Sequence, residues 1–248
     1  MSEKIKEFLS IAQFNMPEMT NLLYEEFLQA KEKQIKAQKF SKDTRFEDSY
    51  IEIEHIPLMK DFLLTLFDEI FFPLIQKPLM INCGHICLIK RSKEEPAYWH
   101  EYLPSSEGVG VIQKYDYWYN HMCKPEDYTK VHNHGFGLAM SACLYLKVPK
   151  DSGRIRFEYK KTDENMILNH FAKNQPPEET YELEPEAGQV ICFPSWMNHG
   201  VTPQTIEEDR LSLAINILEY KKDFFLNYER LMQQDPNFRL NGFGNKIE

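Results

Sequence analysis

The feature that most constrains the fold is a succession of short β-rich runs that starts near residue 79 and continues to residue 219. Turn-forming residues separate these runs, such as Asp151-Ser152-Gly153 and Glu186-Ala187-Gly188. This alternation predicts many short antiparallel strands. We expect strands at residues 80–90, 109–119, 129–134, 137–147, 153–160, 179–184, 188–194, 199–203 and 210–219.

The first 78 residues differ from this pattern, because their apolar residues recur at helical spacing. Two helices are expected within residues 3–40, one on each side of Pro17. A third helix is expected to begin at Pro57 and to end at Pro73. The helical pattern returns from Lys221 to about Gln234.

The order of these elements predicts a mainly β fold with helices, of the α+β class. A layer of helices followed by many antiparallel strands favours a double-sheet barrel with helices packed on one sheet. We expect residues 1–78 to be a helical N-terminal extension packed on the barrel. Residues 79–220 would form the barrel core, and residues 221–248 a C-terminal helix and tail.

Composition excludes some classes of partner. The chain has 248 residues and a formal net charge of −9, which disfavours binding to bulk nucleic acid or to an anionic membrane. Its five cysteines form no CxxC pair, which is typical of reduced thiols. No secretory signal is visible. We therefore expect a cytoplasmic protein; a homodimer is compatible with the sequence.

Three histidines suggest a metal site. His132 and His134 are alternate residues of a predicted strand, so both side chains are expected on one face. Neutral imidazole is a common ligand for iron, zinc, copper and nickel. An HxH pair is weak evidence alone, because it occurs often by chance. His199 begins the strand that follows Phe193-Pro194, where the chain would return across the mouth of the barrel.

Arg210 suggests an anion-binding site. It shares one face of the last predicted strand with Ser212, Ala214 and Asn216, whereas large apolar residues occupy the other face. An arginine in such a strand needs an anionic partner, and a guanidinium can hold a carboxylate through two parallel hydrogen bonds. Ser212 is placed to add a hydroxyl donor. A plainer alternative is that Arg210 pairs with the preceding acidic residues 207–209.

These motifs together resemble the Fe(II)- and 2-oxoglutarate-dependent oxygenases, and are closest to a subgroup often found in marine bacteria and phages. The resemblance covers roughly residues 108–219. It is carried by the HxH pair, by Tyr145 in the next strand, and by Phe193-Pro194-Ser195-Trp196, His199 and Arg210-x-Ser212. Its most specific part is the FPSW…H…RxS pattern.

The resemblance implies a double-stranded β-helix, which is a jelly-roll or cupin-like barrel. It implies that His132, His134 and His199 hold Fe(II), with no catalytic residue beyond the metal centre. It also implies that Arg210 binds 2-oxoglutarate, assisted by Ser212 and Tyr145, although Tyr145 also suits a packed core position. The expected reaction is hydroxylation with O2 as co-reactant and release of succinate and CO2.

One departure from the family leaves the ligand set open. The commonest pattern in these oxygenases is HxD or HxE, whereas the third position here is His134. A carboxylate such as Asp116 or Glu158 is therefore an alternative second ligand.

Two other functions also stay open. One is a cupin-like three-histidine dioxygenase without 2-oxoglutarate; the other is a non-catalytic barrel-shaped binding module. Arg210 counts against the cupin alternative. So does the segment 137–140, which lacks the glutamate that cupins often place after HxH. The substrate, a small molecule or a protein side chain, is not readable from the sequence. We expect loops at residues 92–108 and 161–178 to contact it.

Overall fold

The computed structural model describes residues 3–37, 51–84, 86–101, 115–134, 138–160 and 177–220. The helices are α1 (Glu3–Phe8), α2 (Pro17–Ala37), α3 (Pro57–Leu66) and α4 (Phe72–Ile75), with a 3-10 turn η2 (Ile53–His55) and a π-helical turn η3 (Phe67–Phe71) on either side of α3. The strands are β1 (Ser10–Gln13), β2 (Leu79–Cys83), β3 (Ile86–Lys90), β4 (Tyr98–Glu101), β5 (Tyr117–Met122), β6 (Thr129–His132), β7 (Leu138–Lys147), β8 (Ile155–Tyr159), β9 (Glu179–Leu183), β10 (Gln189–Phe193), β11 (Asn198–Val201) and β12 (Arg210–Glu219).

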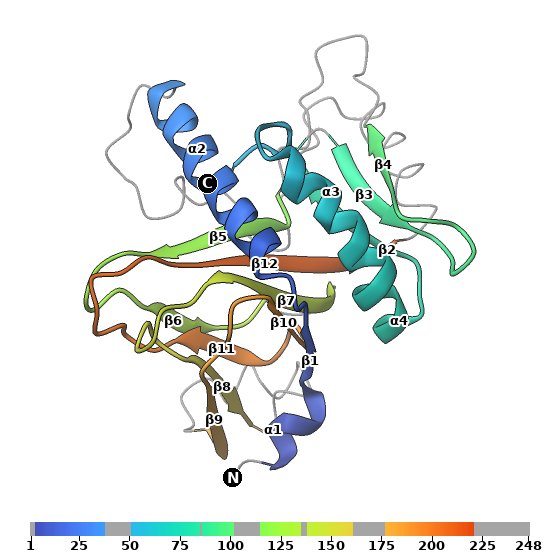
Figure 1. The fold of residues 1–248 in the computed structure, drawn as a ribbon. Coiled ribbons are helices and arrows are strands. Elements are labelled where there is room, and N and C mark those ends of the chain that lie inside the picture. The colour runs from blue at the N-terminus through green and yellow to red at the C-terminus, as the bar shows by residue number, and fades with distance from the viewer. Residues whose placement is uncertain are drawn as a thin grey trace, which may run out of the picture.

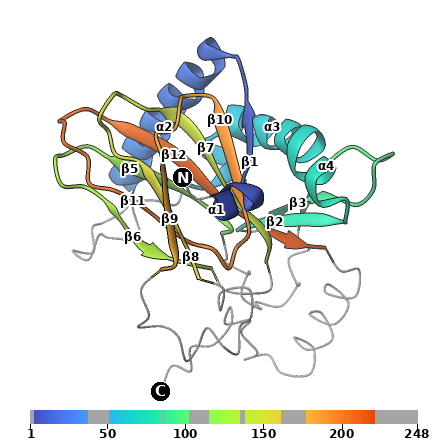
Figure 2. The same cartoon turned by 90° about the horizontal axis from the view of Figure 1, so that it is seen from below.

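Two antiparallel sheets form the body of the protein (Figure 1). The larger sheet has the order β1-β10-β7-β12-β2-β3-β4, and β5 also pairs with β12. The smaller sheet has the order β6-β11-β8-β9. Helices α2 and α3 cover the outer face of the larger sheet, whereas α1 packs beside β8 and β9 (Figure 1 and Figure 2). The predicted class, mainly β with helices, is confirmed, although α1 packs on the smaller sheet and helices α2 and α3 on the larger one.

The central strands of the larger sheet, such as β7 and β12, are buried on both faces, which explains their apolar character. On β12, Leu211, Leu213 and Ile215 pack in the core under α2 and α3. The alternate residue Ala214 packs in a second core, which lies between the two sheets and includes Phe157. Successive residues of a strand point to opposite faces, so the apolar residues from Leu211 to Ile215 alternate between the two cores.

One predicted helical segment is a strand. Residues 10–13 were expected to continue the first helix, but α1 ends at Phe8, and Ser10–Gln13 form β1 on the edge of the larger sheet. Ser10 lies opposite Cys192 of β10. Burial alternates along these four residues, so their pattern fits the two-residue period of a strand. Pairing with β10 outweighs the weak helical periodicity.

Two further differences concern the first strands of the barrel. The single strand expected at residues 80–90 is a hairpin of β2 and β3, in which Gly84 adopts a left-handed conformation with φ of 81°. Both strands are buried throughout, so no change in polarity marks the turn. Tyr98–Glu101, expected within a loop, form the edge strand β4 beside β3.

Other predictions fall outside the described part of the chain. These are the C-terminal helix, most of the 161–178 loop and the first part of the strand at 109–119, whose described part is β5. The division into an N-terminal extension, a core and a tail stays a prediction. None of the described helices has the length and apolar character needed to cross a membrane.

Candidate functional site

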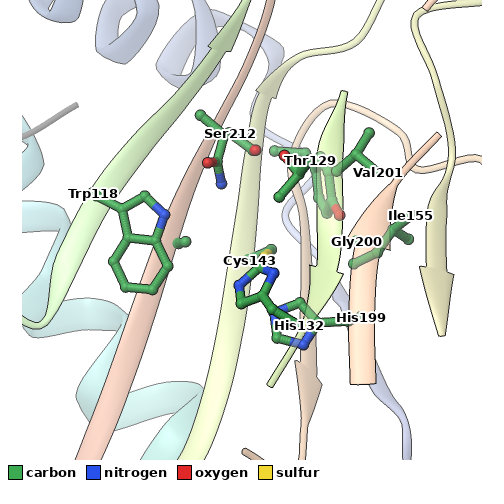
Figure 3. Close-up of a pocket in the computed structure, with 12 residues that line it drawn as sticks. Trp118, Thr129, His132, Cys143, Ile155, His199, Gly200, Val201 and Ser212 are labelled. Carbon is green, nitrogen blue, oxygen red and sulfur yellow. The ribbon is translucent and has the colours of Figure 1, made fainter. Parts of the chain in front are cut away.

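A hollow that opens to solvent lies between the two sheets (Figure 3); the space free of protein atoms is about 370 Å³, which includes the open solvent at its mouth. Both sheets contribute to its wall. The smaller sheet supplies Thr129, His132, Ile155, His199, Gly200 and Val201, and the larger sheet supplies Trp118, Asn120, Cys143, Tyr145, Ser212 and Ala214. A pocket that is mainly apolar and has a few polar groups is the usual form of a small-molecule site.

The structure brings the three predicted histidines together. His132 on β6 lies directly opposite His199 on β11. The Nε2 atoms of His134 and His199 are 3.2 Å apart. Each of the three residues offers a ring nitrogen, and these nitrogens all lie within 4.8 Å of one another. The predicted convergence of these side chains is confirmed.

Local structure differs from the prediction at His134. The strand expected at residues 129–134 ends at His132, so His134 lies just beyond β6. Its backbone N–H donates to the carbonyl of Ser195, in the connection between β10 and β11. The FPSW segment therefore positions His134, which a reading based on strand alternation alone does not reveal.

Two of the histidines have a fixed tautomer. The Nδ1 of His132 is 2.7 Å from the carbonyl of Lys130, and the Nδ1 of His199 is 3.0 Å from the carbonyl of Met197. A carbonyl oxygen only accepts, so in the neutral imidazole each Nδ1 carries the hydrogen and each Nε2 keeps a lone pair. This arrangement is typical of metal-binding histidines.

The third histidine has a different partner. The Nδ1 of His134 is 3.4 Å from Nδ2 of Asn216, whose Oδ1 accepts from the hydroxyl of Ser141. In this amide orientation, Nδ1 of His134 accepts, and its Nε2 carries the proton. Turning the amide by half a rotation would present Oδ1 to an Nδ1–H group and free Nε2 for a metal. Asn216 therefore decides whether His134 can be a ligand.

The charge state of the cluster suits metal binding. Burial and, to a smaller extent, the neighbouring His132 together lower the pKa of His134 to about 4. Burial also lowers the pKa of His199 to about 3, again with a contribution from His132. Both imidazoles are therefore neutral near pH 7 and need not release a proton before they bind a cation.

The alternative carboxylates have other partners. A carboxylate oxygen of Asp116 accepts from the backbone N–H of Asn82 at 3.0 Å, and Glu158 forms a 2.9 Å ion pair with Arg156. Within the described ranges, the group of ligand atoms around His132 contains no carboxylate. The geometry therefore favours His134 over Asp116 and Glu158 as the second ligand.

Arg210 is fully buried, with an exposed fraction of 0%. Its guanidinium carbon lies 5.3 Å from the centre of the Tyr145 ring, and Nη1 lies 3.8 Å from the sulfur of Met122. Nε and Nη2 have no hydrogen-bond partner in the part of the chain that the structure describes. Burial of a cation with unsatisfied hydrogen-bond donors is unfavourable in free energy, so we expect this side chain to bind an anion.

The acidic neighbours of Arg210 do not neutralise it. Asp209 lies on the opposite face of the strand, where it accepts from the hydroxyl of Tyr24 and contacts His121. Ser212 and Ala214 share the face of Arg210 and line the hollow. Tyr145 lines the same hollow and belongs to the core between the sheets, so its two predicted roles are compatible.

Several of the lining residues were not among the predicted site residues. The ring of Trp118 lies 5.4 Å from that of His134, and the neighbouring Asn120 and Cys143 also face the hollow. Burial raises the pKa of the Cys143 thiol to about 12, so the thiol stays neutral. The sequence contained one signal for Trp118. Side chains alternate between faces along Tyr117, Trp118 and Tyr119, and this alternation places Trp118 on the inner face.

Comparisons with known proteins agree with this geometry. Residues 116–216 match the model of a protein family described as "Putative 2OG-Fe(II) oxygenase", which is an enzyme family that uses Fe(II) and 2-oxoglutarate. This segment contains all six predicted site residues. A search of the curated proteins finds no match. The marine or phage origin that the sequence suggests stays a prediction.

Solved structures show the same fold. The non-heme alpha ketoglutarate dependent carbocyclase SnoK from nogalamycin biosynthesis is 14% identical, with a TM-score of 0.50, over 92% of this chain and 90% of that one. HygX from Streptomyces hygroscopicus with iron bound is 10% identical, with a TM-score of 0.50, over 89% and 90%. The epimerase SnoN, in complex with Fe3+ and alpha ketoglutarate, is 14% identical, with a TM-score of 0.50, over 96% and 88%. The predicted double-stranded β-helix is thereby confirmed.

Proposed function

We propose that this chain, whose residues 116–216 match the 2OG-Fe(II) oxygenase family, is an Fe(II)- and 2-oxoglutarate-dependent oxygenase. His132, His134 and His199 would hold the iron through their Nε2 atoms. Arg210 would bind the far carboxylate of 2-oxoglutarate, with Ser212 and Tyr145 in support. Bound iron would supply activation of O2 coupled to decarboxylation of 2-oxoglutarate, which yields succinate and CO2, and the expected outcome is hydroxylation of a C–H bond.

The observation that carries the proposal is the buried guanidinium of Arg210, whose neighbours Tyr145 and Ser212 line the same hollow as His132 and His199. Arg210 has an exposed fraction of 0%, and two of its nitrogens lack a partner among the described residues. A planar guanidinium with free donors binds a carboxylate through two parallel hydrogen bonds. The protein therefore presents a carboxylate site and a metal-ligand site on the same inner surface.

Charge explains why three histidines are compatible with this chemistry. Three neutral imidazoles leave both positive charges of Fe(II) uncompensated, whereas the commoner carboxylate ligand would cancel one. A dianionic cosubstrate would compensate all but one of the three positive charges that the metal and Arg210 carry together. We therefore expect 2-oxoglutarate to bind much more tightly when the metal is present.

The remaining lining residues would orient the ligands and exclude water. The neutral Cys143 thiol and the Trp118 ring add apolar surface beside the histidines. Asn120 and Thr129 add polar groups that a bound molecule can reach. Whether the substrate is a small molecule or a protein side chain stays a prediction.

Calorimetric titration of 2-oxoglutarate into the Mn(II)-loaded protein tests the proposal without turnover. We expect saturable binding that requires Mn(II) and that weakens by at least about 100-fold in Arg210→Met, with Mn(II) affinity unchanged. Arg154→Met is the matched control, because the Arg154 side chain is 57% exposed and should not affect binding. Equal 2-oxoglutarate affinity in Arg210→Met and the unaltered protein would contradict the proposal.

The same experiment separates the alternatives. A cupin-like dioxygenase would bind the metal and consume O2 with no need for 2-oxoglutarate. A non-catalytic module would hold zinc tightly and consume no 2-oxoglutarate. Neither alternative explains the two nitrogens of Arg210 that lack a partner among the described residues, which is why we place them second.

A further inference from the structure

A second cluster of side chains that could bind a metal lies on the outer face of the neighbouring strands β5 and β12. His121 is in β5, Cys123 follows β5, and Asp209 precedes β12. Each of the three offers one ligand atom, and these atoms all lie within 4.8 Å of one another. The ring of His121 packs edge-on against Phe27 of α2, so the cluster faces the helical layer and is separate from the hollow.

We propose that His121, Cys123 and Asp209 bind a divalent cation of borderline softness, with Zn²⁺ as the best fit. Nε2 of His121 lies 3.5 Å from Sγ of Cys123 and 3.4 Å from Oδ1 of Asp209. Tetrahedral zinc with ordinary bond lengths requires separations of roughly 3.6 Å between N and S and roughly 3.4 Å between N and O. The cluster already has these separations, and its three ligands would leave a fourth position for water.

Neighbouring groups hold the ligands in place. The hydroxyl of Tyr24 donates to Oδ2 of Asp209 at 2.7 Å, which leaves Oδ1 directed at His121. The carboxylate of Asp127 accepts from the backbone N–H of Cys123 at 2.9 Å and fixes the residue after the strand. Outer partners of this kind orient metal ligands and raise metal affinity.

Two lysines oppose the site electrostatically. Nζ of Lys31 is 3.1 Å from Nδ1 of His121, and Nζ of Lys147 is 3.2 Å from the hydroxyl of Tyr24. An ammonium group only donates, so its contact with Nδ1 places the hydrogen of His121 on Nε2. A metal at Nε2 moves that hydrogen to Nδ1 and requires the Lys31 ammonium to turn away. Lys31 and the metal ion therefore compete.

Titration of the full-length protein with Co²⁺ tests this site directly. Thiolate coordination gives a sulfur-to-cobalt charge-transfer band in the near ultraviolet, which a site made of histidines alone cannot give. We expect this band in the unaltered protein and its loss in Cys123→Ser. An absent band would overturn the proposal. So would a band that survives in Cys123→Ser and disappears in Cys143→Ser, because Cys143 lines the three-histidine hollow.

Two further variants keep the proposal testable if Cys123→Ser folds poorly. Lys31→Ala should bind Co²⁺ about tenfold more tightly, because it removes a competing positive charge. Tyr24→Phe should bind Co²⁺ about tenfold more weakly, because it removes an outer hydrogen bond. Unchanged affinity in both variants would contradict the site. Neither result depends on the iron proposal, since the two sites share no ligand.

Discussion

His132 and His199 lie directly opposite each other in the antiparallel pair of β6 and β11, and their ring centres are 4.6 Å apart. Cross-strand neighbours are held at this separation by the hydrogen bonds of the sheet. Two of the three candidate ligands are therefore placed by the backbone itself, before any metal binds. The third, His134, depends on the connection that contains Ser195 and on Asn216.

Gly200→Ala should separate the two strands at this point. A Cβ atom at Gly200 would lie 2.7 Å from the carbonyl oxygen of Thr129 and 3.0 Å from the backbone nitrogen of Val131. Because these are backbone atoms of β6, the strands must move apart. We expect the free energy of unfolding in urea to fall by about 1–3 kcal/mol, and the affinity for Mn(II) to fall as well. A variant as stable as the unaltered protein would show that this close approach is not required.

Asn216 should control the metal affinity through His134. Asn216→Leu removes the acceptor that an Nδ1–H group needs, so we expect Mn(II) to bind 10- to 100-fold more weakly, by roughly the usual effect of an outer-shell partner. Asn216→Asp offers an acceptor in every orientation and should retain or raise the affinity. Equal affinity in the leucine and aspartate variants would show that Asn216 does not set the tautomer of His134.

Arg210 should destabilise the protein in the absence of its ligand. Arg210→Met removes a buried charge, two of whose donors have no partner in the described ranges, and keeps most of the side-chain volume. We expect the free energy of unfolding of the ligand-free protein to rise by about 1–3 kcal/mol. Addition of 2-oxoglutarate with Mn(II) should raise the stability of the unaltered protein more than that of the variant. A large loss of stability in Arg210→Met would indicate that Arg210 is mainly structural.

The stability of the metal-free protein should fall as the pH falls below 6.5. Burial lowers the pKa of His134 to about 4 and that of His199 to about 3, from the ordinary value of 6.5. Between these values the unfolded chain binds protons that the folded protein excludes, so a lower pH favours unfolding. Together the two side chains should lower the free energy of unfolding by roughly 2–4 kcal/mol at about pH 5.

Urea unfolding at about pH 7 and about pH 5 measures this cost. The cost should be smaller in His199→Gln, and an identical pH dependence in that variant would count against the assignment.

The sequence alone predicted the last strand and the convergence of the three histidines, whereas the roles of the site residues stay predictions. β12 runs from Arg210 to Glu219 as predicted, because alternation places Leu211 and Ser212 on opposite faces of a strand that is buried on both sides. The convergence of His132, His134 and His199 followed from the FPSW…H pattern together with HxH. The two motifs can be read without the tertiary structure, whereas the pairing of β6 with β11 that brings His132 and His199 together cannot.

Features that depend on distant contacts were not predictable. β1 is a strand because Ser10 pairs with Cys192, far away in the sequence. The contact between Asn216 and His134 depends on how β12 passes the end of β6. The cluster of His121, Cys123 and Asp209 arises because β5 and β12 are neighbours in the sheet. No periodicity or motif in the sequence indicates these three contacts between distant residues.

The most direct test of the central claim is an anaerobic titration of the purified protein with Fe(II) and 2-oxoglutarate, followed by absorption in the visible range. If His132, His134, His199 and Arg210 serve one site, a metal-to-ligand charge-transfer band should appear only when both additions are present. The band should be absent in His199→Gln and strongly weakened in Arg210→Met. Failure of the band to form in the unaltered protein, despite bound Fe(II), would contradict the account.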